Sequence, residues 1–591
     1  MSTNATAPGP DFRPETILAA DFGTATTRVS LFDVVEGVFR YVASGEAPST
    51  LTPPYSDASE GLRHALLDLQ TITDRVMLDD AARLVMPVSA DGHGCDVFVA
   101  TLSGGPAVRA VLVGLMPEVS LRSARRLAAA SYISVVETLS LADHRRREEQ
   151  MDAVLKARPE VVIIAGGTDT GASAATLELA ETVGLACLQL PADRRLRLLF
   201  AGNSALQAKL IDLLGNVASV STAPNIQPEL GREALDGARA ELAKLLDDLR
   251  AAQIGGLRDL AHLAGGQILP TAQAEGQVIR FLSQTADSPN GLISVNVGSA
   301  ATTVAAAFGG ELYLTVAPDL GVGVSARTTL ADAPADQFLR WLPDPGTEAD
   351  AQAFVLERSL RPHTLPMDAD DLHWELALAR LALRGALRRA KAGWPSGLPG
   401  PRADLLPYCD LIVGGGAVLS RAPTAGAAAL VMLDALQPTG LTTLAVDQNH
   451  LLAALGAAAY ANPMAAVQVL ESGALLRLGW AISVLGPARE DEVVCTAKLV
   501  TGDGQETTLT IKAGALEVLP LPLGQHGTLT LNPRSNIDVG FGPGRKQTLE
   551  VDNGGAVGII IDARGRPLAF PRDPARRAAL VKQWIWKLAG A

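Results

Sequence analysis

Residues 17–33 read ILAADFGTATTRVSLFD and hold the strongest structural signal in the chain. Two runs of alternating apolar residues flank a short turn rich in glycine and threonine, which predicts two β-strands joined by a tight hairpin. Gly23 can adopt a positive φ without steric cost. The threonines of the turn, which place hydroxyls beside exposed backbone N–H groups, are Thr24, Thr26 and Thr27. A turn of this composition can wrap an anion.

Asp21 ends the first strand of this first hairpin. Its carboxylate would lie at the mouth of the anion site, where it could hold a hydrated magnesium ion. The same residues also fit an ordinary exposed hairpin with a solvated aspartate, and short motifs of this kind occur by chance. The first hairpin taken alone therefore leaves both interpretations open.

A second copy of the hairpin favours the functional interpretation. Residues 292–308 read LISVNVGSAATTVAAAF and repeat the first hairpin 275 positions further on. The matched pairs are Asp21 with Asn296, Gly23 with Gly298, Ala25 with Ala300, Thr27 with Thr302 and Val29 with Val304. A repeat at this distance is too long for a solenoid, so it predicts two similar domains that face each other across a cleft.

The composition limits the class of protein. The chain has 591 residues, enough for about four domain-sized units. Hydrophobic residues at 48% and charged residues at 19% indicate a globular chain, and a net charge of −13 argues against a nucleic-acid-binding surface. The four cysteines have no metal-ligand spacing, which is typical of reduced, buried thiols in a cytoplasmic protein.

Targeting and membrane segments are not expected either. The polar N-terminus lacks the apolar core of a signal peptide. Residues 451–470 are long and uncharged enough to raise the question of a membrane span, but they are rich in alanine and interrupted by Asn462 and Pro463. We therefore expect a buried helix that ends near Asn462.

Strand and helix signals alternate from residue 120 onward, which predicts a mostly parallel α/β sheet. One apolar strand, residues 160–165, opens directly onto GGTDTG at residues 166–171. Ligands bind at the carboxyl ends of parallel strands, so Asp169 could be a catalytic or metal-binding carboxylate. Alternatively, Asp169 only caps the following helix. Upstream of this region, residues 82–88 are expected to form a short strand.

A triple glycine marks the second half of the chain. Residues 410–420 read DLIVGGGAVLS, an apolar strand followed by Gly414, Gly415 and Gly416. Three consecutive glycines remove side chains from one surface, so a flat heterocycle or ribose could lie against the backbone. The alternative is a tight packing turn between a strand and a helix.

The C-terminal region has a different pattern. Residues 492–551 alternate short strands and turns, which predicts a small antiparallel β module. A basic helix with Trp584 and Trp586 closes the chain, and it could either dock a partner or pack on the body of the protein.

Eight motifs together resemble one family. They are DFGTATTRVSLFD, AGGTDTG, AGN at 201–203, ILPTAQA at 268–274, NVGSAATTV, DLGVGVSA, IVGGGAVLS and DQNHLLAALG. Over residues 16–462 the chain is similar to the GlmL (MutL-type) proteins, which accompany coenzyme-B12-dependent glutamate (methylaspartate) mutase. The resemblance implies the duplicated ribonuclease-H-like, two-lobe ATPase fold of actin, Hsp70 and sugar kinases, with an inserted α/β region and the C-terminal antiparallel β module.

The resemblance also implies a function. Such proteins are thought to be reactivating chaperones that exchange damaged cobalamin on the mutase for intact cofactor. By this resemblance the chain would bind ATP and Mg²⁺, would meet cobalamin only through a partner, and would have adenosylcobalamin-dependent mutase subunits as partners. The sequence leaves a homo-oligomer open.

The resemblance assigns site residues and domains. The first phosphate site would be Asp21, Gly23, Thr24 and Thr26, the second Gly298, Ser299 and Thr302, and the adenosine site Gly414 to Gly416. The expected domains are a flexible tail over 1–15, a first ATPase lobe over 16–88, an inserted or continuing α/β region over 89–290, a second ATPase lobe over 291–462, and a C-terminal β module with terminal helix over 463–591.

One departure from the family pattern bears on catalysis. The second hairpin of the family normally begins with aspartate and carries another acidic residue after the threonines, where this chain has Asn296 and Val304. Asparagine keeps a hydrogen-bonding oxygen but loses the charge that helps to bind magnesium and to orient water. Phosphoryl transfer depends on positioning and charge neutralisation, so a weak or absent ATPase is expected. Two alternatives remain, a small-molecule kinase with Asp169 as general base and a nucleotide-free scaffold on the same fold.

Overall fold

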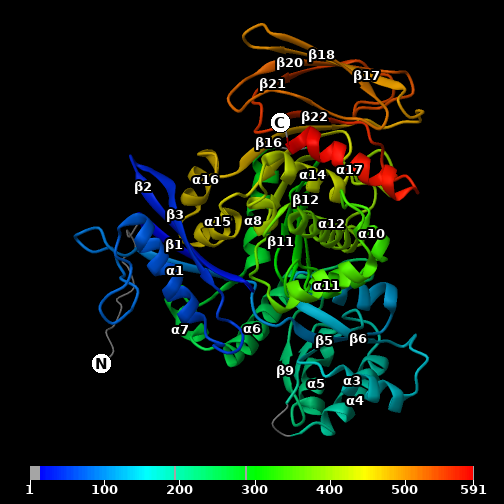
Figure 1. Ribbon diagram of the computed structural model, residues 1–591. Helices are drawn as coiled ribbons and strands as arrows, with labels where there is room; N and C mark the ends of the chain where they lie inside the picture. Colours follow the sequence, from blue (N-terminus) through cyan, green and yellow to red (C-terminus); the bar gives the residue numbers. More distant parts are fainter. Residues whose placement is uncertain (1–13, 192–194, 287–288, 590–591) are drawn as a thin grey trace.

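The computed structural model describes residues 14–191, 195–286 and 289–589. The predicted N-terminal tail therefore lies almost entirely outside the described residues. Within them, the chain folds into two lobes, an inserted parallel sheet and a C-terminal region that lies on the second lobe (Figure 1).

The first lobe is built on a five-stranded sheet in the order β10-β4-β1-β2-β3. Its strands are β1 (Thr16–Phe22), β2 (Thr26–Val35), β3 (Val38–Pro48), β4 (Val97–Leu102) and β10 (Leu269–Pro270). Its helices are α1 (Ala58–Thr73) and α7 (Leu257–Leu263). Asp57 caps α1 by accepting a hydrogen bond from the backbone N–H of Ser59, and the helix buries Leu62, Leu66 and Leu69 against the sheet. The first-lobe sheet thus takes two strands from beyond residue 88.

The second lobe repeats this arrangement in the order β13-β12-β11-β14-β15. Its strands are β11 (Gly291–Val297), β12 (Thr302–Phe308), β13 (Glu311–Ala317), β14 (Cys409–Gly415) and β15 (Leu441–Val446). Its helices are α9 (Ala326–Ala331), α10 (Ala335–Leu339), α11 (Glu348–Leu360), α12 (Ala369–Lys391), α13 (Ala417–Ser420), α14 (Ala425–Leu436) and α15 (Leu451–Ala461). In each lobe the first strand pairs antiparallel with the second and parallel with the fourth.

The two hairpins have the same register. Phe22 pairs with Thr27 in the first lobe and Val297 pairs with Thr302 in the second, which is the same pairing shifted by the repeat distance. This duplicated topology is the two-lobe fold of the actin and Hsp70 type, so the predicted fold class is confirmed.

Two helices lie between the lobes, α8 (Thr271–Thr285) and α15 (Figure 1). Ile279 on α8 and Leu455 on α15 share one buried cluster with Ile17 of the first sheet and Leu292 of the second. The uncharged stretch thus forms the buried helix that was expected, and it ends next to Asn462. Among the described residues, no helix combines the length and the apolar character that crossing a bilayer requires.

A five-stranded, all-parallel sheet is inserted between β4 and β10. Its strands are β5 (Val108–Gly114), β6 (Ile133–Leu139), β7 (Val161–Ala165), β8 (Arg197–Phe200) and β9 (Ser219–Thr222), in the order β6-β5-β7-β8-β9. Its helices are η1 (Pro117–Leu121), α2 (Arg122–Ala129), α3 (Arg147–Ala157), α4 (Ala174–Leu188), η2 (Ser204–Leu206), α5 (Gln207–Leu214) and α6 (Asp236–Gln253). Leu112 and Ile163 face one buried cluster and Val113 and Ile164 the other, so helices cover both faces, as parallel sheets require.

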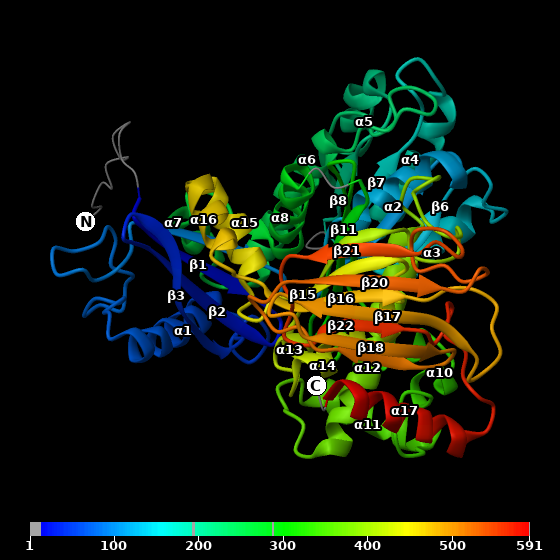
Figure 2. The same cartoon turned by 90° about the horizontal axis from the view of Figure 1, so that it is seen from above.

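The C-terminal region continues the sheet of the second lobe past residue 462. Strands β16 (Leu476–Ser483), β22 (Gly558–Asp562) and β19 (Leu516–Leu519) extend it to eight strands. Strands β17 (Val493–Thr501), β18 (Glu506–Lys512), β20 (Gly527–Pro533) and β21 (Gln547–Val551) form a separate antiparallel sheet that packs over this extension (Figure 2). Helix α16 (Pro463–Glu471) packs against the first lobe, and α17 (Pro574–Ala589) lies on the second.

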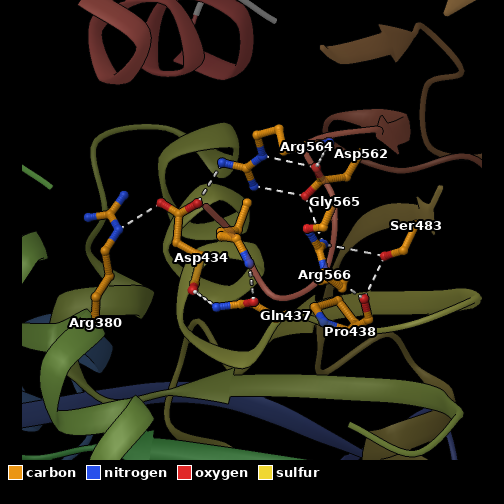
Figure 3. A network of polar contacts seen from close by, with 10 residues as sticks. Arg380, Asp434, Gln437, Pro438, Ser483, Asp562, Arg564, Gly565 and Arg566 are labelled. Carbon is orange, nitrogen blue, oxygen red and sulfur yellow. Dashed lines mark hydrogen bonds and ion pairs between the residues drawn. The ribbon is translucent and has the colours of Figure 1, made fainter. Parts of the chain in front are cut away.

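Buried ion pairs hold the C-terminal region on the second lobe (Figure 3). Asp434 of α14 accepts hydrogen bonds from Arg380 of α12 at 2.8 Å and from Arg564, just after β22, at 2.7 Å. Asp562 accepts from Arg564 and Arg566. Burial favours the neutral acid, but the two arginines hold the pKa of Asp562 well below its usual value.

Candidate functional site

The two hairpin turns have the same hydrogen-bond geometry. The N–H of Gly23 donates to the carbonyl of Thr26 at 3.0 Å, and the N–H of Gly298 donates to the carbonyl of Ala301 at 2.9 Å. A Cβ atom at Gly23 would lie 2.7 Å from the Thr26 oxygen, which is closer than real contacts allow. Glycine is therefore required by the turn itself, and the turn presents backbone rather than side chains.

Asp21 is held in one orientation by two hydroxyl groups. Thr101 of β4 donates to its Oδ1 at 2.6 Å and Thr271, at the start of α8, donates to the same oxygen at 2.8 Å. No described residue bonds Oδ2, and no three acidic, histidine or cysteine side chains of the described chain converge as a metal site. A lone carboxylate with a free oxygen fits Mg²⁺, which keeps most of its waters and takes further ligands from phosphates.

Glu275 is the acidic residue that the sequence analysis did not identify. It lies on α8, only 3% exposed, and its Oε1 accepts a hydrogen bond from Nδ2 of Asn296. Its Oε2 is buried and has no hydrogen-bond partner among the described residues. Burial raises the pKa of Glu275 to about 8, a rise that the Asn296 bond opposes and the charges of Asp447 and Asp21 increase.

Glu275 is thus a neutral acid at neutral pH, bonded to the asparagine that replaces the expected aspartate. One sequence signal could have revealed it. Glu275 is in helical phase with Ala272, Val278 and Ile279, so a charged residue falls on the buried face of an otherwise apolar stripe.

Asp447 is a buried acidic residue that the second lobe places near Glu275. It follows β15, is 4% exposed, and accepts hydrogen bonds from the backbone N–H groups of Leu451 at 2.7 Å and Leu452 at 2.9 Å. Burial raises its pKa to about 6, against the effect of these two bonds. The Asp447 carboxylate caps the N-terminus of α15 with these two hydrogen bonds, and the helix therefore fixes its position.

The triple glycine lies beside the second hairpin, since Gly415 pairs with Asn296 in the sheet. Packing explains two of the three glycines. A Cβ atom at Gly416 would lie 2.1 Å from the Val297 carbonyl oxygen, and one at Gly414 would lie 2.9 Å from Met432. At Gly415 the nearest atom would be 3.5 Å away, an ordinary contact. Among the three glycines, Gly415 alone has space for a Cβ atom, so packing does not explain why it is a glycine. The adenosine site stays a prediction.

The hydroxyl groups of the hairpins divide into two sets. Thr27 is 1% exposed with its Oγ1 unbonded inside the first lobe, and the matched Thr302 donates to the carbonyl of Leu320 inside the second. Their hydroxyls point away from the turns, so only their backbone could reach an anion. The partly exposed hydroxyls belong to Thr24, Thr26 and Ser299.

Asp169 lies apart from these residues, on the loop after β7 in the inserted sheet. Its side chain is exposed and accepts hydrogen bonds from Asn225 at 3.0 Å and from the N–H of Ser204 at 3.1 Å. The Asn225 bond in particular lowers its pKa. The N-cap of α4 is Ser173, so Asp169 does not cap that helix but ties together the loops that follow β7, β8 and β9.

Ion pairs join the two lobes directly. Glu46 of β3 pairs with Arg28 of the first hairpin at 2.8 Å and also with Arg421 of the second lobe. Next to them, Nε2 of His450 bonds the Ser420 hydroxyl, and burial with the nearby positive Arg28 lowers its pKa to about 3. The lobes are therefore in direct polar contact.

Several solved structures resemble this chain at low identity. Nucleotide-free acetone carboxylase is 12% identical over 85% of this chain and 82% of its own, with a TM-score of 0.33. EutJ from Carboxydothermus hydrogenoformans is 11% identical over 76% and 90%, with a TM-score of 0.26. Component A of (R)-2-hydroxyglutaryl-CoA dehydratase from Acidaminococcus fermentans is 8% identical over 76% and 99%, with a TM-score of 0.25.

No curated protein sequence matches the chain. A family model does, and it covers the hairpins, the inserted sheet, the triple glycine and α15. This model, described as MutL protein, matches residues 17–473, and the chain therefore belongs to the MutL protein family.

Proposed function

We propose that this protein binds ATP with Mg²⁺ between its lobes and works as an accessory protein that reactivates an adenosylcobalamin-dependent mutase. The observation that carries the proposal is the pair of hairpins in identical register on opposite sides of α8. Each offers backbone N–H groups at a glycine turn, which is what a phosphate chain needs. If both hairpins bind the same phosphate chain, the ligand would fix the angle between the two lobes.

The chain's own residues have distinct roles in this proposal. Asp21 would hold Mg²⁺ through its free oxygen, and the hairpins at Gly23 and Gly298 would grip the phosphates. When bound, Mg²⁺ would neutralise phosphate charge. Because Asn296 supplies no second charge and Glu275 is protonated at neutral pH, we expect tight binding with slow or absent hydrolysis.

Isothermal titration calorimetry tests the binding step. The wild-type protein should bind ATP in the presence of Mg²⁺, and Asp21→Asn should lose the magnesium dependence while folding normally. Asp169→Asn is the matched control, because that carboxylate lies on the inserted sheet. Absence of binding heat with well-folded wild-type protein would end the proposal and leave the nucleotide-free scaffold.

Asn296→Asp tests the cause of slow turnover. If the missing charge limits hydrolysis, the variant should release phosphate faster than the wild type. Acceptor-dependent release of ADP that collapses in Asp169→Asn would instead favour the small-molecule kinase.

The mutase role needs its own test, which is whether a cobalamin-containing protein co-purifies with the chain and is released by ATP.

A further inference from the structure

The inserted sheet contacts helix α8 and the second lobe through its amino-terminal edge. Tyr132 immediately precedes β6 on this edge, and its carbonyl accepts a hydrogen bond from Val108 at the start of β5. Its side chain is 8% exposed and packs with Ala272 of α8 and Val316 of β13, beside Ala301 in the second hairpin turn. One residue of the insert thus contacts both the interlobe helix and the second lobe.

The Tyr132 hydroxyl also faces the proposed nucleotide site. It lies within reach of the Thr303 side chain, which belongs to the residue that pairs with Asn296 across the second hairpin. Burial raises the pKa of Tyr132, and the charges of Glu275 and Asp21 raise it further, so both acidic groups act on this ring. Tyr132 therefore lies beside the acidic groups of the proposed nucleotide site.

Arg250 supports the opposite hairpin. It lies on the last turn of α6, is 6% exposed, and donates to the carbonyl of Gly104 at 2.8 Å. Gly104 in turn lies against the first hairpin, since a Cβ atom there would be 2.6 Å from the carbonyl oxygen of Gly23. The guanidinium lies 5.7 Å from the centre of the Tyr132 ring. The two side chains form one connection from hairpin to hairpin through the insert.

Arg250 is also a buried cation without a carboxylate within ion-pair distance among the described residues. A buried charge without a close counter-ion is costly, and here the guanidinium contacts a carbonyl and an aromatic ring, while the carboxylates of Asp247 and Glu160 act on it from beyond ion-pair distance. A phosphate chain on the first hairpin would bring negative charge to this side of the molecule. Ligand binding would therefore change the interaction that holds the insert in place.

We propose that Tyr132 and Arg250 are positioning residues that couple nucleotide binding to a movement of the inserted sheet. This inference rests on the proposed function. Helix α6 begins after the loop that holds Asn225, has Arg250 in its last turn, and is about 27 Å long. It therefore connects the cleft to the loops at the carboxyl edge of the insert, where Asp169 joins three of them.

Spin-label distances measure this movement directly. The four native cysteines are buried, so a thiol label would modify only introduced ones. Labels at His64→Cys on α1 and Thr170→Cys on the loop after β7 lie at exposed positions of the first lobe and the insert. We expect the distance distribution between them to shift when ATP and Mg²⁺ are added.

Tyr132→Phe separates coupling from packing, because it keeps the ring and removes only the hydroxyl. It should abolish the distance shift while weakening ATP binding by no more than about fivefold, the effect of one neutral hydrogen bond. Arg250→Met should abolish the shift, and Arg250→Lys should partly restore it. Tyr41→Phe is the matched control, since that hydroxyl bonds only Ser44 within β3.

The outcomes are distinguishable. Wild-type protein that binds ATP without a distance shift, or a Tyr132→Phe variant that shifts as the wild type does, would overturn the coupling and leave the proposed function intact. Wild-type protein that binds no ATP would overturn both.

Discussion

Glu275 makes the folded protein a better proton binder than the unfolded chain, because its pKa rises from 4.5 to about 8 on folding. The stability that this proton contributes is complete below about pH 4.5 and is lost as the pH rises through about 8. The Glu275 side chain is buried, so solvent screens the effect little.

We therefore expect Glu275→Gln to flatten the pH dependence of unfolding. Between about pH 5 and pH 8 the wild type should lose on the order of a few kcal/mol relative to the variant. Urea unfolding at several pH values measures this, with Glu181→Gln on the surface of α4 as control. Parallel stability curves for wild type and Glu275→Gln would contradict the assignment.

At the scale of residues, the sequence identifies a position most clearly where the backbone of a turn demands a particular residue type. Gly23 is required by its own turn, and at the matched Gly298 a Cβ atom would make a tight contact of 3.0 Å with the Ala301 oxygen, so the repeat reveals both positions. Glu275 reaches the second hairpin only because α8 lies between two sheets that are remote in sequence, and neither hairpin motif contains it. Thr27 and Thr302 belong to the motif, yet strand alternation turns their hydroxyls inward.

At the scale of elements, strand β14 and helix α13 meet at the triple glycine. The packing and adenosine interpretations of these glycines predict different stabilities and different ATP affinities for their alanine variants. Gly416→Ala should severely destabilise the protein, because the new Cβ would meet the Val297 carbonyl and Gly416 has a φ of +89°. Gly415→Ala should fold with an almost unchanged melting temperature. If the adenosine prediction holds, this second variant should also bind ATP more weakly, measured by calorimetry. Unchanged affinity would leave packing as the only reason for the glycines.

Elements with a long periodic pattern were predictable. The helix expected to end near Asn462 and the parallel strand over 160–165 both appear as predicted. The strand expected over residues 82–88 was wrong, because its backbone groups bond neighbouring loops instead of a strand ladder. Val85 donates to the carbonyl of Met77, Val88 donates to the Asp96 side chain, and Pro87 has no N–H to donate.

At the scale of the whole molecule, the sheets join segments that no local pattern connects. The C-terminal β module was predictable from its turns, but not the pairing of β16 with β22, which places strands from both ends of that region in the sheet of the second lobe. The second lobe and the C-terminal region therefore share one continuous sheet. Besides this sheet, the buried ion pairs in Figure 3 connect the C-terminal region to the helices of the second lobe.

Asp434→Asn tests that connection. It would leave Arg380 and Arg564 buried with less negative charge, and breaking a buried ion pair costs about 3–5 kcal/mol. We expect a large drop in the denaturation midpoint, measured by urea unfolding. Asp404→Asn, in an exposed pair with Arg402, should leave the midpoint unchanged. Equal effects of the two substitutions would show that the network contributes no more than a surface pair.

The extension of the second-lobe sheet by β16 also determines where the chain can be shortened. Strand β15 pairs with β16 from Leu441 to Val446, so removing everything after residue 475 would expose a row of unpaired N–H and C=O groups along an apolar strand. Such an edge is a template for self-association, and a chain ending there should scatter light and sediment as aggregates. We therefore expect the last fifth of the sequence to keep the two lobes from self-associating.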